Sequence, residues 1–104
     1  MGFKIVFTKP AIADLEGLAR FISNDNPRAA EQFGHAIIGK AEGLGEFPFL
    51  GRVVPEFKIE TIREIVHRPY RIVYRVFEDR KTIEIPRVWH AARGTPDIWP
   101  TAGL

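Results

Sequence analysis

Residues 70–77 read Tyr70-Arg71-Ile72-Val73-Tyr74-Arg75-Val76-Phe77. The alternation of side chains in this segment is typical of a β-strand, in which successive residues point to opposite faces of a sheet. One face carries the apolar side chains of Tyr70, Ile72 and Tyr74, and the other carries the guanidinium groups of Arg71 and Arg75. Because Val73 and Phe77 also lie on the arginine face, we predict that this face is partly covered, by the C-terminal tail or by another chain.

Two further strand-like runs flank this segment, at approximately Thr61–His67 and Thr82–His90. The turns between the three runs, at Arg68-Pro69 and Asp79-Arg80, are short, and short connections predict an antiparallel meander. Pro86 lies inside the last run and has no N–H group for a ladder hydrogen bond. We therefore expect a bulge or an edge position at Pro86.

The N-terminal half predicts one more strand and two helices. Residues 3–7 alternate as a strand does, and Thr8 with Pro10 is a typical helix start, so a first helix should run to about Ser23. Asn26-Pro27 is a second helix start after a short turn, which predicts an antiparallel helical hairpin. Glycines in the second helix either lower its helix propensity or allow the two helices to approach closely; they are Gly34, Gly39 and Gly43.

The predicted fold class is α+β, with the order β-α-α-β-β-β. It is a mostly antiparallel sheet with the N-terminal helical hairpin packed on one face. We expect residues 1–104 to form a single domain, in which residues 45–55 are a Gly- and Pro-rich break and residues 94–104 an irregular tail.

Charge is unevenly distributed along the chain. The net charge is only +2, but ten of the 15 Lys and Arg residues lie in residues 51–104, and eight of those ten are arginine. A basic, arginine-rich half favours a polyanionic ligand or an acidic protein partner, although arginine stems that simply cover apolar surface give the same pattern. The absence of cysteine excludes disulfides and thiolate metal sites, and we expect a soluble, cytoplasmic protein without membrane association.

Four motifs occur in a familiar order behind the two predicted helices. They are residues 49–55 (FLGRVVP), 62–65 (IREI), 70–76 (YRIVYRV) and 88–93 (VWHAAR). Together they resemble the RelE/ParE superfamily of toxins from type II toxin–antitoxin systems (the plasmid stabilisation family), over almost the whole chain to about Pro96. The resemblance implies a cognate antitoxin partner. It also implies one of two activities, either messenger RNA cleavage on the ribosome without a metal or inhibition of DNA gyrase by binding.

Metal-free RNA cleavage requires a general base, a general acid and cations around the phosphate. His90, with an ordinary pKa suited to neutral pH, is the candidate acid or base. The remaining predicted catalytic residues are arginines, namely Arg63, Arg71 and Arg93. The predicted substrate-binding residues are Arg52, Lys58 and Tyr74. We predict no metal and no cofactor, since no cluster has metal-ligand spacing.

Some of these residues also have structural interpretations. Arg63 with Glu64, and Arg75 with Glu84, are candidate cross-strand ion pairs. Tyr74 fits a core position, and only two lysines, Lys58 and Lys81, accompany the arginines of residues 51–104.

Three hypotheses remain open from the sequence. The first, slightly preferred, is a ribosome-dependent messenger RNA endoribonuclease. The second is a gyrase inhibitor whose contact surface includes Ile98-Trp99-Pro100, and the third is an inactive toxin-like interaction module. In each case the apolar residues Val53, Val54, Ile98 and Trp99 are candidates for surface that another chain covers.

Overall fold

The structure of the chain, a computed structural model, describes residues 2–98. Its elements follow the order β1 (Lys4–Phe7), α1 (Lys9–Asp25), α2 (Pro27–Gly43), β2 (Arg52–Val53), β3 (Ile62–His67), β4 (Tyr70–Phe77) and β5 (Thr82–His90). The five strands form one sheet in the order β1-β5-β4-β3-β2, in which only the β1–β5 pair is parallel. The predicted α+β class is confirmed, with the two-residue strand β2 as an addition inside the expected break.

Both helices begin where the sequence predicts. The Thr8 hydroxyl accepts a hydrogen bond from the Ala11 N–H at 3.2 Å, and the Asn26 side chain accepts one from the Ala29 N–H at 3.1 Å. These caps satisfy backbone donors that the first helical turn leaves without partners. The first helix runs two residues beyond the predicted end, to Asp25. Among residues 2–98, no helix combines the length and the apolar character needed to cross a membrane.

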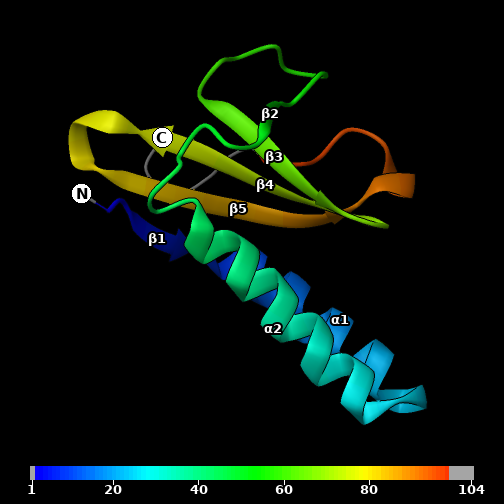
Figure 1. The fold of residues 1–104 in the computed structure, drawn as a ribbon. Helices are drawn as coiled ribbons and strands as arrows, with labels where there is room; N and C mark the ends of the chain where they lie inside the picture. The colour runs from blue at the N-terminus through cyan, green and yellow to red at the C-terminus, as the bar shows by residue number, and fades with distance from the viewer. Residues whose placement is uncertain (1, 99–104) are drawn as a thin grey trace.

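The helical hairpin packs on one face of the sheet and extends past the sheet at its far end (Figure 1). Ile37 of α2 and Leu44, the residue that follows the helix, are fully buried against Ile72 and Tyr74 of β4 and Ile85 of β5. Each of these side chains contributes roughly 1.5–3 kcal/mol through the removal of apolar surface from water. This layer is the main core of the fold.

A second, smaller core lies on the opposite face of the sheet. Val54, Ile62, Val73 and Ile98 form one buried cluster there, and Ile98 brings the C-terminal tail across the sheet. The prediction that the tail partly covers this face is confirmed. The prediction that Val54 and Ile98 offer surface to another chain is wrong, because each is at most 1% exposed and they are buried in the same cluster. The other predicted tail residues, Trp99 and Pro100, lie outside the described residues.

Pro86 marks an irregularity of the sheet, as predicted. Val73 pairs with Arg87, whereas Arg75 pairs with Glu84, so the register between β4 and β5 shifts by one residue at this point. The ladder from β1 to β5 ends at Ile85, one residue before the proline. The bulge therefore stands where β5 loses its β1 neighbour and where proline could not donate a ladder bond.

The glycines of the chain have opposite roles in the loop and in the helices. A Cβ atom on Gly51 would collide with the Glu64 carbonyl oxygen and would lie 2.9 Å from the Tyr74 ring. In contrast, a Cβ atom on Gly34, Gly39 or Gly43 would meet no atom within 4 Å. The interpretation of the helical glycines as a close helix–helix approach is therefore wrong, and they act only through helix propensity.

We predict that Gly51→Ala lowers the free energy of unfolding by more than about 2 kcal/mol, because the backbone of β3 or the Tyr74 ring would have to move. Gly39→Ala is the matched control. It makes the same chemical change at an exposed helical site and should raise stability by about 0.5–1 kcal/mol. Urea unfolding of both variants measures the difference, and a loss of similar size in both would contradict the assignment.

A second prediction concerns pH. Burial, and then the positive charge of Lys40, lower the pKa of His67 from its ordinary value of 6.5. The unfolded chain therefore takes up a proton more readily than the folded protein, so this contribution to stability is present above pH 6.5 and is lost as the pH falls below it. The free energy of unfolding should therefore fall as the pH is lowered from 7.5 to 5.5.

Thermal unfolding across this pH range tests the assignment. His67→Phe is the control, because phenylalanine retains an aromatic ring against Phe33 but does not titrate. An unchanged pH dependence in His67→Phe would show that another group is responsible.

Candidate functional site

The arginine face of β4 lies on the side of the sheet away from the helices. At its centre is the carboxylate of Glu64 on β3, whose side chain is fully buried. Arg71 donates from Nε to Glu64 Oε1 at 2.5 Å, and Arg52 of β2 donates from Nε to Oε2 at 2.6 Å. A buried carboxylate is tolerated only with such partners, because water no longer solvates it. Glu64 therefore joins strands β2, β3 and β4 through two arginines.

Arg71 has a second carboxylate partner. Glu56, in the loop after β2, accepts from Arg71 Nη1 at 2.8 Å and from Nη2 at 2.7 Å, which is the two-bonded geometry that favours arginine over lysine. The hydrogen bonds from Arg71 lower the pKa of Glu56 below its ordinary value, and those from Glu56 and Glu64 raise the pKa of Arg71. All three guanidinium nitrogens of Arg71 thus bond within the protein.

These residues border a pocket of about 580 Å³ at the end of the sheet. We term it the arginine pocket, and it is lined by Arg52, Pro55, Glu56, Val66, Arg68, Pro69, Arg71 and Ala91. The Arg52 side chain is 60% exposed although it bonds to Glu64. Arg68 is also exposed and makes no ion pair within residues 2–98. The pocket therefore holds two guanidinium groups that a ligand can reach.

Two predicted site residues face the other way. Arg63 donates to the backbone carbonyls of Glu60 and Gly51 at 2.9 Å, and its guanidinium lies over the Phe49 ring at 4.8 Å. Tyr74 is fully buried, and its hydroxyl accepts a hydrogen bond from the Gly51 N–H at 2.9 Å. Burial raises the pKa of Tyr74. Both side chains hold the loop before β2 in place.

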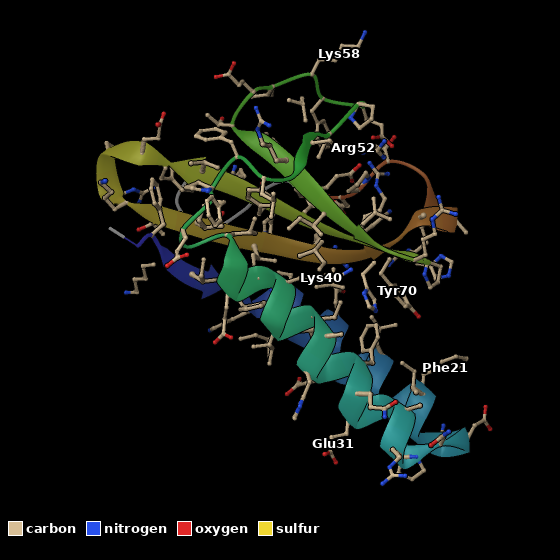
Figure 2. The ribbon with its side chains drawn as sticks, viewed as in Figure 1. Phe21, Glu31, Lys40, Arg52, Lys58 and Tyr70 are labelled. Carbon is tan, nitrogen blue, oxygen red and sulfur yellow. The ribbon has the colours of Figure 1, made fainter. Side chains whose placement is uncertain are left out.

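Of the two cross-strand ion pairs predicted from the sequence, one forms and the other does not. Arg75 and Glu84 are in contact at 2.7 Å, which confirms that prediction. The pair of Arg63 with Glu64 is wrong, because neighbours along a strand point to opposite faces. Lys58 lies at the exposed tip of the loop between β2 and β3, far from the helices (Figure 2), with a left-handed φ of 53°.

His90 and Arg93 occupy a second pocket, of about 310 Å³, on the helix side of the sheet. Figure 2 shows Tyr70, which borders this pocket, between the sheet and the helices. Its ring meets the His90 ring edge-on at 5.2 Å. His90 Nδ1 accepts a hydrogen bond from the Ala92 N–H at 3.0 Å, which leaves Nε2 as the nitrogen that faces away from this bond. The Arg93 guanidinium stacks 4.0 Å from the centre of the Trp89 ring.

The predicted site residues therefore lie in separate places. Arg52 and Arg71 share the arginine pocket, Arg63 and Tyr74 support the loop, and His90 lies across the sheet with Arg93. Metal-free RNA cleavage needs the base and the cations on the same phosphate. Within the described part of the chain, no three His, Asp or Glu side chains form a group that could hold a metal ion.

The sequence interpretation missed the acidic residues that organise this face. Glu56 and Glu64 neutralise Arg71, and Asp14 of α1 binds Arg87 through two hydrogen bonds of 2.8 and 2.9 Å. Strand alternation places Glu64 on the same face as Arg71 and was a usable signal. The contacts of Glu56 and Asp14 depend on loop and helix placement, for which the sequence carries no local pattern.

Comparison with known proteins is consistent with this architecture. A sequence profile described as "ParE toxin of type II toxin-antitoxin system, parDE" matches residues 5–94. The chain is 34% identical over 91 residues to Toxin RelE2 of Caulobacter vibrioides, covering 86% of this chain and 97% of that protein.

Two solved structures have a similar fold. A chain of the chromosomal ParDE toxin–antitoxin system from P. aeruginosa has a TM-score of 0.67 at 22% identity, covering 85% of this chain and 95% of that chain. A chain of the toxin–antitoxin complex RelBE2 from Mycobacterium tuberculosis has a TM-score of 0.61 at 23% identity, covering 86% and 99%.

We predict that Glu64→Gln lowers the free energy of unfolding by about 2–4 kcal/mol, because Arg52 and Arg71 would lose a buried charge partner. Glu60→Gln is the control, since Glu60 is an exposed loop residue, and its effect should stay within about 0.5 kcal/mol. Denaturant unfolding of the two variants is the measurement. Equal stability of the two would mean that Glu64 does not organise this face.

Proposed function

Because the chain belongs to the RelE/ParE family of type II toxin–antitoxin toxins, we propose that it arrests growth by binding a protein target, and that the target is DNA gyrase. A cognate antitoxin neutralises it. The family match supports the toxin assignment, and the solved toxin–antitoxin complexes of similar fold support an antitoxin partner. The choice between binding and RNA cleavage depends on the residues of this chain.

The observation that carries the proposal is the neutralisation of the arginine face from within. Arg71 bonds to Glu56 and Glu64, Arg75 to Glu84, and Arg87 to Asp14. A nuclease without a metal needs cations that are free to meet the charge that develops on the phosphate. Carboxylates beside those cations repel an incoming phosphate instead. An arrangement of this kind suits a folded surface that recognises another protein.

RNA cleavage remains the second candidate, and one specific observation favours it. His90 and Arg93 border the same pocket, and within residues 2–98 the Nε2 atom of His90 has no hydrogen-bond partner. The imidazole, with one nitrogen that is not bonded, is a candidate acid or base. The neighbouring guanidinium is a candidate cation for the phosphate, and these are the fewest groups that RNA cleavage needs. The pocket lacks the other predicted catalytic arginines, Arg63 and Arg71, which lie elsewhere.

Controlled expression in a bacterial host tests the proposal. We expect growth arrest with induction of the SOS response and intact transcripts, because a poisoned gyrase leaves DNA breaks and does not touch RNA. With purified gyrase, the protein should block supercoiling of plasmid DNA. Co-expression of the adjacent small reading frame should restore growth and yield a co-purifying complex.

The double variant His90→Ala/Arg93→Ala separates the two activities. Transcripts that are cut by the unaltered protein and are intact with the double variant would establish RNA cleavage and overturn the proposal. Normal growth on induction of the unaltered protein would also contradict it, and would leave an inactive interaction module.

A further inference from the structure

The arginine pocket combines reachable cations with an apolar wall. Arg52 and Arg68 supply exposed guanidinium groups, and the wall consists of Pro55, Val66, Pro69 and Ala91. Val66 is 42% exposed and so adds apolar surface that a ligand can reach. The volume of about 580 Å³ lies within the range of roughly 300–1,000 Å³ that is typical of ligand sites. The pocket thus has room for a side chain and its flanking residues.

The charges of the arginine pocket define what it can hold. Three arginines, Arg52, Arg68 and Arg71, face two glutamates, Glu56 and Glu64, which leaves one net positive charge. Arg71 is committed to the two glutamates, so the unmatched cation is Arg68, supported by the outer edge of Arg52. One guanidinium with a free fork matches one carboxylate in two-bonded geometry.

From this juxtaposition we propose that the arginine pocket binds a segment of the cognate antitoxin that carries one Asp or Glu between apolar residues. The carboxylate pairs with Arg68 and Arg52, and the apolar neighbours cover Val66, Pro69 and Ala91. This inference rests on the proposed function in one respect, that a cognate antitoxin exists.

A protein segment fits the pocket better than a nucleic acid does. RNA presents a phosphate at every nucleotide and is held by several uncompensated cations. Here Glu56 lines the pocket beside the arginines and would face a second phosphate with like charge. A single carboxylate with apolar flanks avoids that repulsion and also removes the apolar wall from water.

Two capped pentapeptides probe the pocket directly, acetyl-Ala-Val-Glu-Leu-Ala-amide and the same peptide with Gln in place of Glu. Each is titrated into the purified full chain, and methyl NMR signals of Val66 and Ala91 report binding in the pocket. We expect the Glu peptide to bind about tenfold more tightly than the Gln peptide, since a charge-assisted pair replaces a neutral one. Equal affinities, or no shift of these signals with either peptide, would overturn the proposal.

Three variants test the assignment of charges. Arg68→Gln should lower the affinity for the Glu peptide about fivefold. It should not change the melting temperature, because Arg68 has no ion pair to lose within residues 2–98. Glu56→Gln should tighten binding of the same peptide about threefold, because the net charge of the pocket rises. Arg28→Gln, at an exposed position near the start of α2, is the matched control and should change nothing.

A purely structural role for these residues would not increase affinity in Glu56→Gln. A loss of affinity in Arg28→Gln equal to that in Arg68→Gln would show nonspecific attraction and contradict the proposal. Hexauridylate is the competitor for the nucleic-acid alternative. If it binds more tightly than the Glu peptide and shifts the same methyl signals, the pocket is an RNA site.

The full antitoxin, expressed from the adjacent reading frame, separates failure of this inference from failure of the proposed function. A stable complex in which the Val66 and Ala91 signals shift, and which Arg68→Gln weakens, supports the pocket as the docking site. A stable complex that leaves these signals unmoved overturns the site alone. If no complex forms, the adjacent reading frame does not encode a cognate antitoxin. This result would overturn both the antitoxin in the proposed function and the docking site inferred from it.

Discussion

The carboxylate of Glu64 is buried in the sheet and needs two arginines to remain there. Its position on β3 brings Arg52 from β2 and Arg71 from β4 to one point. Because Glu64 and Arg71 are buried away from water, neither of these two charges can be left unpaired at an acceptable energy, so the three strands keep their relative positions. Arg71 in turn holds Glu56, and its Nη1 atom lies 3.4 Å from the Gly94 carbonyl oxygen at the start of the tail. The loop after β2 and the tail thus both depend on the charge of Glu64.

The pairing of arginines with carboxylates also explains why the arginine-rich C-terminal half does not form a strongly basic surface. The C-terminal half carries most of the arginines, yet the structure pairs Arg71, Arg75 and Arg87 with carboxylates. What remains for a ligand in the arginine pocket is the outer edge of Arg52 and the side chain of Arg68. The fold of a toxin family is compatible with more than one activity, so the local balance of charge has to decide between them. Here the balance of charge favours recognition of a protein over binding of RNA.

Local patterns predicted the regular elements well and the site poorly. The strands at Tyr70–Phe77 and Thr82–His90 have the predicted bounds, because a period of two residues is a property of the strand itself. Strand β2 was missed because two residues cannot show a period. Burial of Val54 by Ile98 joins residues far apart in the chain, and no local pattern reports such a contact. Arg63 and Arg71 were both predicted to be catalytic, but the register of β3 on β4 pairs Arg63 with Tyr74 and so places it on the face opposite Arg71.

The two faces of the sheet therefore have different roles: one forms the core, and the other carries the arginine pocket. On the helix side, Tyr74 is sealed in the core, and its hydroxyl binds the backbone N–H of Gly51, so the loop that leads into β2 is fixed from below. On the open side, the next residue, Arg52, can then reach Glu64 only from this one direction. A loop held through Gly51 lets Arg52 keep most of its surface exposed while it still bonds to a buried carboxylate. The exposed edge of the arginine pocket is thus a consequence of core packing on the opposite face, and a change in the core at Tyr74 would alter the pocket without touching it.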